Sequence, residues 1–321
     1  MEESQIFQHN HCGFPVHVKE YCKGKTDIPI VVIGGAFQNI DQIERMSKAL
    51  ARESWTIVFD TPGNGQTGVL PSNYPFEFIA DCIDASLKTM GVRKINLVGF
   101  SYGCLIALRY IQRFASKVSR LVLLGAMHRI PEHLEYEFNL MIFYLKWDRQ
   151  DAFADSFTNL MSNPLLRQTN KLARLAGEKL HHALMTASIG LREQFMHNTQ
   201  RILDHGNMPL NSLPDVRTLV STGEHDVFVP PAANEVIANA MPRGRYVSIP
   251  GADHMIHVVQ FKKTIQTILR GCGVHNERRP MPTFTFPPSR HRIHRASGTG
   301  ISPPNKLAGP ASDLAGKRYS R

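Results

Sequence analysis

The sequence predicts an α/β fold with a mostly parallel, doubly wound sheet and a helical cap insertion. Short apolar segments rich in β-branched residues alternate with longer segments whose apolar residues recur at helical spacing. The short segments are apolar at consecutive positions, which is typical of strands covered on both faces. Alternation of such strands with helices indicates parallel strands joined by crossover helices.

The expected strands are the short apolar segments. Residues 14–19 alternate in polarity, as an edge strand or one arm of a hairpin does. Core strands are expected at 28–33, 55–60, 94–99, 120–124, 217–221 and 246–249. Helices with one apolar face are expected at 41–51, 76–90, 104–114 and 256–270. Strands and helices therefore alternate along most of the chain.

The interval 128–211 breaks this alternation. It has almost no strand pattern, but helical periodicity recurs at 134–145, 171–184 and 191–203. Because a structureless loop of this length is uncommon in a compact domain, we expect a helical cap over the carboxyl edge of the sheet. The core then consists of 1–127 and 212–273. The Phe, Met and Leu residues of the cap are expected to pack between its helices and, in part, to line an apolar pocket.

The basic character of the chain is concentrated at its end. The formal net charge is +10, and residues 274–321 carry nine basic residues against two acidic ones. This segment also holds seven prolines and few large apolar residues, so we expect a disordered, basic, Pro-rich tail. Such a tail suits contact with anionic surfaces. The core carries little net charge, and we expect no nucleic-acid binding by it.

The remaining composition is that of an intracellular globular protein. Five cysteines occur without any C-x-x-C pair, which is not the pattern of a disulfide framework or a zinc knuckle. No apolar run approaches the roughly 18 residues of a membrane helix, and the N-terminus is acidic where a secretory signal is basic. We therefore expect a cytoplasmic protein without a transmembrane segment.

The strongest local motif is Gly-Phe-Ser-Tyr-Gly at 99–103, a G-x-S-x-G pattern. It lies between an expected strand and an expected helix, which is the setting of a nucleophile elbow. Glycines at both ends permit a tight turn that lifts the Ser101 hydroxyl off the sheet edge, where the helix N-terminus stabilises negative charge. Ser101 is therefore the candidate nucleophile. The alternative is an ordinary turn with a capping serine.

A serine hydroxyl needs a general base, and the base needs an orienting carboxylate. Asp226 follows the strand expected at 217–221, and His254 follows the strand expected at 246–249. Both therefore fall at the same sheet edge as Ser101, in the order nucleophile, acid, base. The alternative acids and bases in these two loops are Glu224, Asp253, His225 and His257.

Acyl transfer also needs hydrogen-bond donors aimed at the developing oxyanion. Gly34, Gly35 and Ala36 follow the first core strand, and their small size lets backbone N–H groups approach a substrate. We expect the N–H groups of Ala36 and Tyr102 to form the oxyanion hole. Phe37 is the alternative to Ala36.

Two further patterns bear on cofactors and metals. Residues 63–68 read G-x-G-x-x-G after a strand, but turn-forming residues follow where a nucleotide-binding helix would begin. His254 and His257 have helical spacing, and His9 and His11 form a second pair, but neither pair has an evident third ligand. We therefore expect no cofactor and no metal.

Taken together, these motifs resemble the α/β-hydrolase superfamily over residues 15–272. Residues 60–67, Asp-Thr-Pro-Gly-Asn-Gly-Gln-Thr, resemble its D-x-P-G-x-G-x-S turn. Residues 222–226 resemble its acid loop, and residues 250–254 resemble its histidine loop. The resemblance implies the α/β-hydrolase fold and a catalytic triad of Ser101, Asp226 and His254.

One position departs from that pattern, because the usual His-Gly of the oxyanion loop is Gly34-Gly35 here. The Gly-Ala-aromatic sequence of the loop, residues 35–37, is similar to that of the acyltransferases that make the hydroxyalkanoyloxy-alkanoate precursor of rhamnolipids. The similarity implies acyl transfer to an acceptor other than water as an alternative to hydrolysis.

These observations predict a serine esterase or thioesterase that forms an acyl-enzyme on Ser101 and releases a hydrophobic acyl group. The expected partner is a small-molecule acyl substrate, free or linked to a carrier or to coenzyme A. The alternatives are an acyltransferase, a non-hydrolytic enzyme of the same fold (lyase, cofactor-free oxygenase or haloperoxidase), and a ligand-binding module with an inactive triad.

Overall fold

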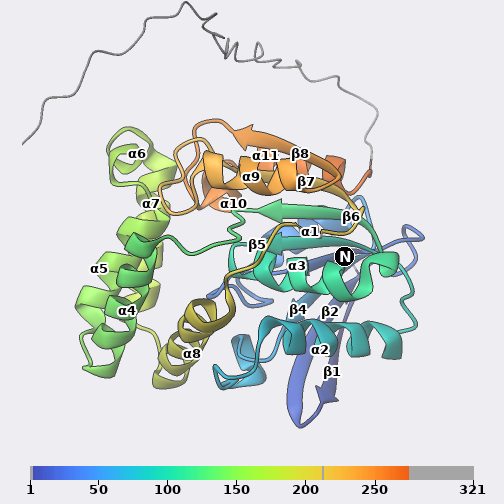
Figure 1. Ribbon diagram of the computed structural model, residues 1–321, viewed down its shortest axis with the longest axis horizontal. Coiled ribbons are helices and arrows are strands. Elements are labelled where there is room, and N and C mark those ends of the chain that lie inside the picture. Colours follow the sequence, from blue (N-terminus) through green and yellow to red (C-terminus); the bar gives the residue numbers. More distant parts are fainter. Residues whose placement is uncertain (1–2, 212, 275–321) are drawn as a thin grey trace, which may run out of the picture. The chain divides into compact units, whose positions relative to one another are not determined.

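The computed structural model describes residues 3–211 and 213–274. A single sheet forms the centre of this region, with the strand order β1-β2-β4-β3-β5-β6-β7-β8 (Figure 1). Its strands are β1 (Ser4–His11), β2 (Phe14–Tyr21), β3 (Ile30–Ile33), β4 (Thr56–Asp60), β5 (Ile95–Phe100), β6 (Val118–Leu124), β7 (Arg217–Gly223) and β8 (Arg243–Ile249).

The sheet is mostly parallel, as the sequence predicts. The strands from β4 through β3, β5, β6 and β7 to β8 pair in parallel, whereas β2 pairs antiparallel with β1 and with β4. The fold class is therefore confirmed. Strand β1 was not expected from the sequence, because it is an edge strand whose side chains are mostly exposed and polar.

Side chains along each strand alternate between two apolar layers. Ile57 and Leu97 face one layer, while the following residues, Val58 and Val98, face the other. The first layer is closed by α2 (Phe76–Thr89), α3 (Tyr102–Phe114) and α9 (Pro231–Ala240). The second is closed by α1 (Glu44–Ala51), α10 (Ile256–Val259) and α11 (Phe261–Gly271). Burial on both faces explains why the core strands are apolar at consecutive positions.

Two helical features differ from the expectation. The single helix expected at 256–270 is divided into α10 and α11, because Gln260 leaves the helical region with φ −126° and ψ 48°. Helix α9, which begins at Pro231, was not expected. Its consecutive prolines at 230–231 suit the first turn of a helix, where no N–H bond is lost.

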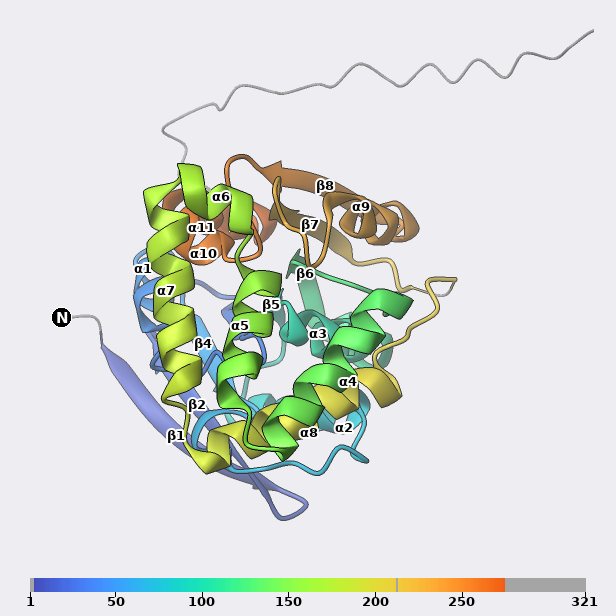
Figure 2. The same cartoon turned by 90° about the vertical axis from the view of Figure 1, so that its left-hand side faces the viewer.

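The segment between β6 and β7 is helical. It contains α4 (Glu132–Lys146), α5 (Gln150–Met161), α6 (Pro164–Thr169), α7 (Lys171–Met185) and α8 (Ile189–His205). Viewed from the side in Figure 2, α4, α5, α7 and α8 lie in front of the sheet. Helix α4 packs against α5 and α8, and α5 packs against α7. We call these five helices the cap.

The basic tail predicted from residue 274 onward lies, apart from Val274, outside the described residues. Within the described residues, no helix combines the length and the apolar character that crossing a bilayer requires.

Candidate active site

Ser101 lies in the turn between β5 and α3. Its φ of 47° and ψ of −111° belong to a region that L-residues rarely adopt. Two backbone hydrogen bonds of 2.8 Å hold the turn, from Ser101 N to Leu124 O and from Cys104 N to Ser101 O. The turn therefore has the strained geometry of a nucleophile elbow.

Close packing accounts for both glycines of the G-x-S-x-G motif. A Cβ atom at Gly99 would lie 2.6 Å from the carbonyl oxygen of Gly103. A Cβ atom at Gly103 would lie 2.4 Å from the carbonyl oxygen of Ile33. Since backbone cannot yield at such distances, neither position accommodates a side chain.

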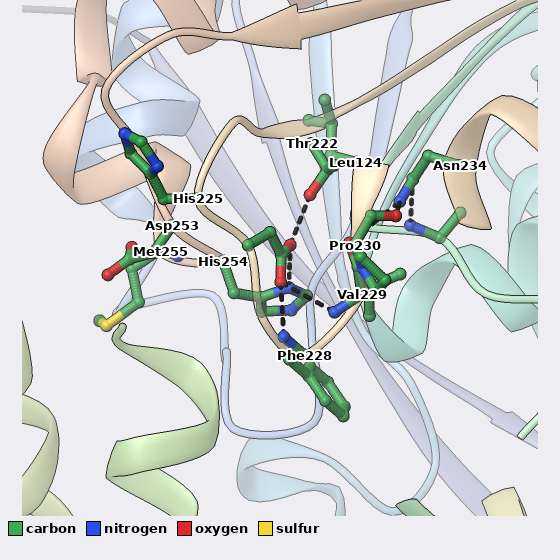
Figure 3. A network of polar contacts seen from close by, with 12 residues as sticks. Leu124, Thr222, His225, Phe228, Val229, Pro230, Asn234, Asp253, His254 and Met255 are labelled. Carbon is green, nitrogen blue, oxygen red and sulfur yellow. Dashed lines mark hydrogen bonds and ion pairs between the residues drawn. The ribbon is translucent and has the colours of Figure 1, made fainter. Parts of the chain in front are cut away.

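The carboxylate of Asp226 is buried in the loop after β7, and both of its oxygens accept hydrogen bonds. Its Oδ2 accepts from the hydroxyl of Thr222 and lies 2.8 Å from Nδ1 of His254. Its Oδ1 accepts from the N–H groups of Phe228 (3.0 Å) and Val229 (2.8 Å). Figure 3 shows Thr222, Phe228 and Val229 beside His254. The carboxylate orients the ring with a proton on Nδ1, which leaves Nε2 as the free base.

The ring of His254 is held in a fitted space. Its side chain is 6 % exposed, and the ring of Phe228 meets it edge-on with 4.9 Å between centroids. Gly125, which follows β6, has φ +69°, and a Cβ atom there would lie 2.7 Å from Cε1 of His254. Gly125 therefore makes room for the imidazole. No sequence motif points to this glycine.

Asp253, the alternative acid next to His254, joins the cap to the core instead. Its Oδ2 accepts hydrogen bonds from the Ser162 hydroxyl (3.2 Å) and the Asn163 N–H (3.1 Å). Its Oδ1 accepts from the Met255 N–H at 3.0 Å. Burial raises the pKa of Asp253, although these hydrogen bonds oppose that shift. In Figure 3 its side chain lies away from the His254 ring.

Glu224, His225 and His257 also lie apart from the Asp226–His254 pair or have partners elsewhere. Glu224 is exposed and accepts a 3.0 Å hydrogen bond from a backbone N–H of the histidine loop. His225 is exposed, and in Figure 3 its side chain lies away from His254. His257 lines the same cavity as Ser101, but its Nε2 contacts the side chain of Gln38 at 2.9 Å.

The loop after β3 lies beside the candidate nucleophile. A Cβ atom on Gly35 would lie 3.6 Å from Cβ of Ser101. The Gly35 N–H donates to Oε1 of Gln38 at 2.9 Å, so this amide is not free for a substrate. Ala36 and Tyr102 line the same cavity as Ser101, and Tyr102 opens α3, where the first N–H groups lack intrahelical partners. Their role as oxyanion donors stays a prediction.

A cavity of about 420 Å³ extends from Ser101 under the cap. Its wall is mainly apolar and includes Phe138, Phe157, Met161, Leu180, Leu184 and Phe195 from the cap. Phe37 from the loop after β3 stacks on Phe195 with 4.3 Å between ring centroids. His254 also lines this cavity, so the candidate nucleophile and base face one mostly apolar space.

The glycine-rich segment 63–68 serves packing under the cap. Within it only a short 3₁₀ turn forms, Gly65–Thr67. A Cβ atom on Gly63 would lie 3.1 Å from Oδ1 of Asn198 on α8, and the amide nitrogen of Asn198 donates to the Gly63 carbonyl oxygen at 2.9 Å. Gly63 thus permits close packing against α8. In the part of the chain that is described, no group of three or more His, Cys, Asp or Glu is placed to hold a metal ion.

A buried cation fastens α8 to the nucleophile turn. Arg201 is fully buried, and its Nη1 donates to the hydroxyl of Tyr102 at 2.9 Å and to Oδ1 of Asn198 at 2.6 Å. Its Nε and Nη2 donate to three carbonyl oxygens of the loop 70–74 at 2.7, 2.7 and 2.8 Å. All five partners are neutral. No sequence motif points to this arginine.

Residues 28–261 match the family described as "alpha/beta hydrolase fold". The chain belongs to the α/β hydrolase family. The chain is 23 % identical over 257 residues to a proline iminopeptidase of Pestalotiopsis fici, with 73 % of this chain and 88 % of the relative covered. It is 22 % identical over 203 residues to a putative carbamate hydrolase of Pantoea ananatis, with 63 % of this chain and 72 % of the relative covered.

Solved structures of other hydrolases share the fold. An α/β hydrolase from a Medee basin deep-sea metagenome superposes with a TM-score of 0.75 at 16 % identity, covering 86 % of this chain and 100 % of its own. An enol-lactonase from Burkholderia xenovorans superposes with a TM-score of 0.71 at 17 % identity, covering 83 % of this chain and 99 % of its own. The proline iminopeptidase, the carbamate hydrolase and the enol-lactonase differ in substrate by name, so the shared fold leaves the substrate of this chain to be argued from its own site.

Asn234, on α9, helps to build the site although it carries no sequence signal. It is buried and accepts from the Ala126 N–H at 2.9 Å. Its amide donates to the carbonyl oxygens of Val229 (3.2 Å) and Pro230 (3.3 Å), as Figure 3 shows. It thereby anchors the loop that carries Asp226. A lone asparagine in a helix has no pattern that reveals such a role.

Proposed function

We propose that this hydrolase-family protein cleaves a carboxylic ester or thioester of a hydrophobic acyl group through an acyl-enzyme on Ser101. One observation carries the proposal. The 2.8 Å contact between His254 and the buried Asp226 orients a base in the same cavity that Ser101 lines from a strained turn.

In the first half-reaction, Oγ of Ser101 attacks the carbonyl carbon of the substrate, and Nε2 of His254 takes the hydroxyl proton. The negative charge that develops on the carbonyl oxygen is stabilised by the N–H groups of Ala36 and Tyr102. When the carbonyl–heteroatom bond breaks, the leaving alcohol or thiol takes the proton from His254. The acyl group then remains on Ser101 as an ester.

The second half-reaction repeats these steps with water. His254 removes a proton from a water molecule as its oxygen attacks the acyl carbon, and the proton returns to Oγ of Ser101 when the ester bond breaks. Asp226 accepts a hydrogen bond from Nδ1 throughout, which stabilises the imidazolium that forms in each half. The products are a carboxylic acid and the free enzyme.

The cavity favours a hydrophobic acyl chain. Aromatic and aliphatic side chains of the cap form most of its wall, and an acyl chain that leaves water for this wall gains about 0.8 kcal/mol per methylene. We therefore expect catalytic efficiency on p-nitrophenyl esters to rise from acetate towards medium chains. A preference for acetate contradicts this part of the proposal.

Labelling with a fluorophosphonate probe tests the nucleophile. We expect the wild-type protein to gain one phosphonyl adduct on Ser101 by intact-mass and peptide mass spectrometry, and Ser101→Ala to gain none. Ser116→Ala, at an exposed serine, serves as the control that keeps full labelling. Equal labelling of wild type and Ser101→Ala overturns the proposal.

A second candidate is transfer of the same acyl group to an acceptor other than water. The apolar wall around Ser101 favours an acceptor that brings its own hydrophobic chain over water. Product analysis separates the two reactions, since hydrolysis gives a free acid whereas transfer gives a new ester when a hydroxylated fatty acid is supplied with the acyl donor. Absence of an acyl adduct on Ser101 with any ester or thioester donor would contradict both reactions and favour a non-hydrolytic enzyme of the fold or a ligand-binding module.

A further inference from the structure

Gln38 connects the loop after β3 to helix α10. Its Oε1 accepts a hydrogen bond from the Gly35 N–H at 2.9 Å, and its Nε2 lies 2.9 Å from Nε2 of His257. Its backbone N–H also donates to the Gly35 carbonyl oxygen at 3.0 Å. Gln38 thus binds both peptide groups that flank Gly35.

The chemistry of these contacts fixes the direction of every hydrogen bond. A backbone N–H only donates, so the amide oxygen of Gln38 faces Gly35 and the amide nitrogen faces His257. The Nε2 atom of His257 must therefore be an unprotonated acceptor, with the ring proton on Nδ1. Burial, with a contribution from His254, lowers the pKa of His257 to about 4, which is consistent with a neutral ring near pH 7.

Tight packing explains why residue 34 is glycine. A Cβ atom at Gly34 would lie 2.7 Å from the carbonyl oxygen and 2.9 Å from Cβ of Gln38. Any side chain at this position would displace Gln38 from both of its partners. Gly34 therefore allows Gln38 to fold back over the loop.

This arrangement bears on the oxyanion hole. The Gly35 carbonyl and the Ala36 N–H belong to one planar trans peptide, so they point in opposite directions. Because Gln38 holds the carbonyl on its own side, the Ala36 N–H is directed away from Gln38. The loop lies against Ser101, as the 3.6 Å approach of a Cβ atom on Gly35 to Cβ of Ser101 indicates.

We propose that Gln38 and His257 are positioning residues that hold the Ala36 N–H towards the oxyanion formed at Ser101. The inference rests on the proposed acyl-transfer function. His257, which the sequence offered only as an alternative base or metal ligand, acts here as a hydrogen-bond acceptor that orients Gln38. In this proposal neither residue exchanges a proton with the substrate. We call this pair the relay.

The test compares apolar and conservative variants on p-nitrophenyl octanoate. Gln38→Leu and His257→Leu remove the relay, and we expect kcat to fall about 10- to 100-fold with KM within about twofold, because a misaligned donor costs less than a deleted one. His257→Gln supplies an amide oxygen that can accept from Gln38, and it should retain kcat within about threefold of wild type. The double variant should match the single variants, since both act on one amide.

A transition-state analogue gives a readout that a purely structural role would not produce. An octyl trifluoromethyl ketone forms a tetrahedral adduct with an oxyanion, so its Ki should rise by the same factor by which kcat/KM falls. The matched control is Gln112→Leu. Gln112 on α3 is exposed, and its Oε1 accepts from the side chain of Arg109 at 3.1 Å, also at a spacing of three residues but outside the relay. We expect it to keep kcat and Ki.

Each outcome decides the inference. Wild-type kcat in Gln38→Leu and His257→Leu, with normal fluorophosphonate labelling of wild type, overturns the relay and leaves the proposed function intact. Failure to label wild type overturns both. If a leucine variant misfolds, as thermal unfolding will reveal, His257→Gln decides alone, and a loss of kcat in this folded variant overturns the relay.

Discussion

Arg201 of the cap and Tyr102 of the nucleophile turn are joined by a 2.9 Å hydrogen bond in the protein interior. The Tyr102 hydroxyl accepts from the guanidinium and donates to Asn198 at 3.1 Å. Burial raises the pKa of Tyr102, while Arg201 opposes that shift. Because residue 102 also supplies a predicted oxyanion donor, helix α8, which covers the cavity, is bonded directly to the residue that follows the candidate nucleophile.

Loss of Arg201 should destabilise the whole domain. We expect Arg201→Leu to lower the free energy of unfolding by at least about 3 kcal/mol, because each buried acceptor left without a donor costs about 1–3 kcal/mol. Urea unfolding followed by circular dichroism measures the change. Arg149→Leu, at an exposed cap arginine paired with Asp151, is the control and should unfold like wild type. Similar losses in both variants would contradict the assignment.

Two Asp→Asn exchanges test whether Asp226 or Asp253 is the acid that orients His254. Asp226→Asn should lower kcat by about 10⁴-fold, because the amide no longer selects the tautomer of His254 that leaves Nε2 free. Asp253→Asn should instead lower thermal stability and keep most of the turnover, because that carboxylate binds Ser162 and Asn163 of the cap. Steady-state kinetics and thermal unfolding of both variants separate the two roles, and a reversed pattern would assign catalysis to Asp253.

Gly125 offers a test of the space around the base. Gly125→Ala places a methyl group 2.7 Å from the His254 ring, and we expect kcat to fall about 100-fold because a shift of about 1 Å in a catalytic group has that effect. The control is Gly91→Ala. Gly91 has φ +74°, close to the +69° of Gly125, but its Cβ would meet no atom within 4 Å.

Both glycine variants should therefore lose about 1–2 kcal/mol of stability from the left-handed backbone alone. Only Gly125→Ala should lose turnover when kcat is measured at a temperature where both are folded. Equal kcat values for the two variants would show that Gly125 does not shape the position of the base.

His257 should make stability depend on pH in acid. Its pKa is lowered from 6.5 to about 4, so the unfolded chain binds the proton more readily than the native state between these values. The contribution of His257 is therefore fully present above about pH 6.5 and is lost as the pH falls to about 4. We expect His257→Gln to flatten the fall of the unfolding free energy over this window.

Asp60 changes the unfolding free energy in the opposite direction over a similar pH range. Wild type must therefore be compared with His257→Gln to identify the contribution of His257. Burial raises the pKa of Asp60 from 3.8 to about 6, which makes the native state bind its proton more readily and adds stability as the pH falls from about 6 to about 3.8. Urea titrations of wild type and His257→Gln at about pH 4.5, 5.5 and 7 isolate the contribution of His257 to the unfolding free energy. A constant difference between the two proteins across these pH values would contradict the prediction.

The fold class and the order of the candidate residues along the chain could be predicted from local sequence patterns. Strands such as 95–100 are apolar at consecutive positions because both faces are covered, and that pattern is local. The elbow at Ser101 was also readable, since the two glycines it needs are close to each other in the chain. The edge strand β1 and helix α9 were missed because their residues carry little of the buried pattern.

Which of the candidate residues come into contact depends on how the elements pack in three dimensions. Three acids stand in the two loops near His254, and the 2.8 Å contact of Asp226 depends on how those loops pack. Gln38 and His257 lie 219 positions apart, and Arg201 donates to a carbonyl oxygen 131 positions away. Such contacts arise when packed layers bring distant backbone and side-chain groups within hydrogen-bond distance, and no local periodicity encodes them.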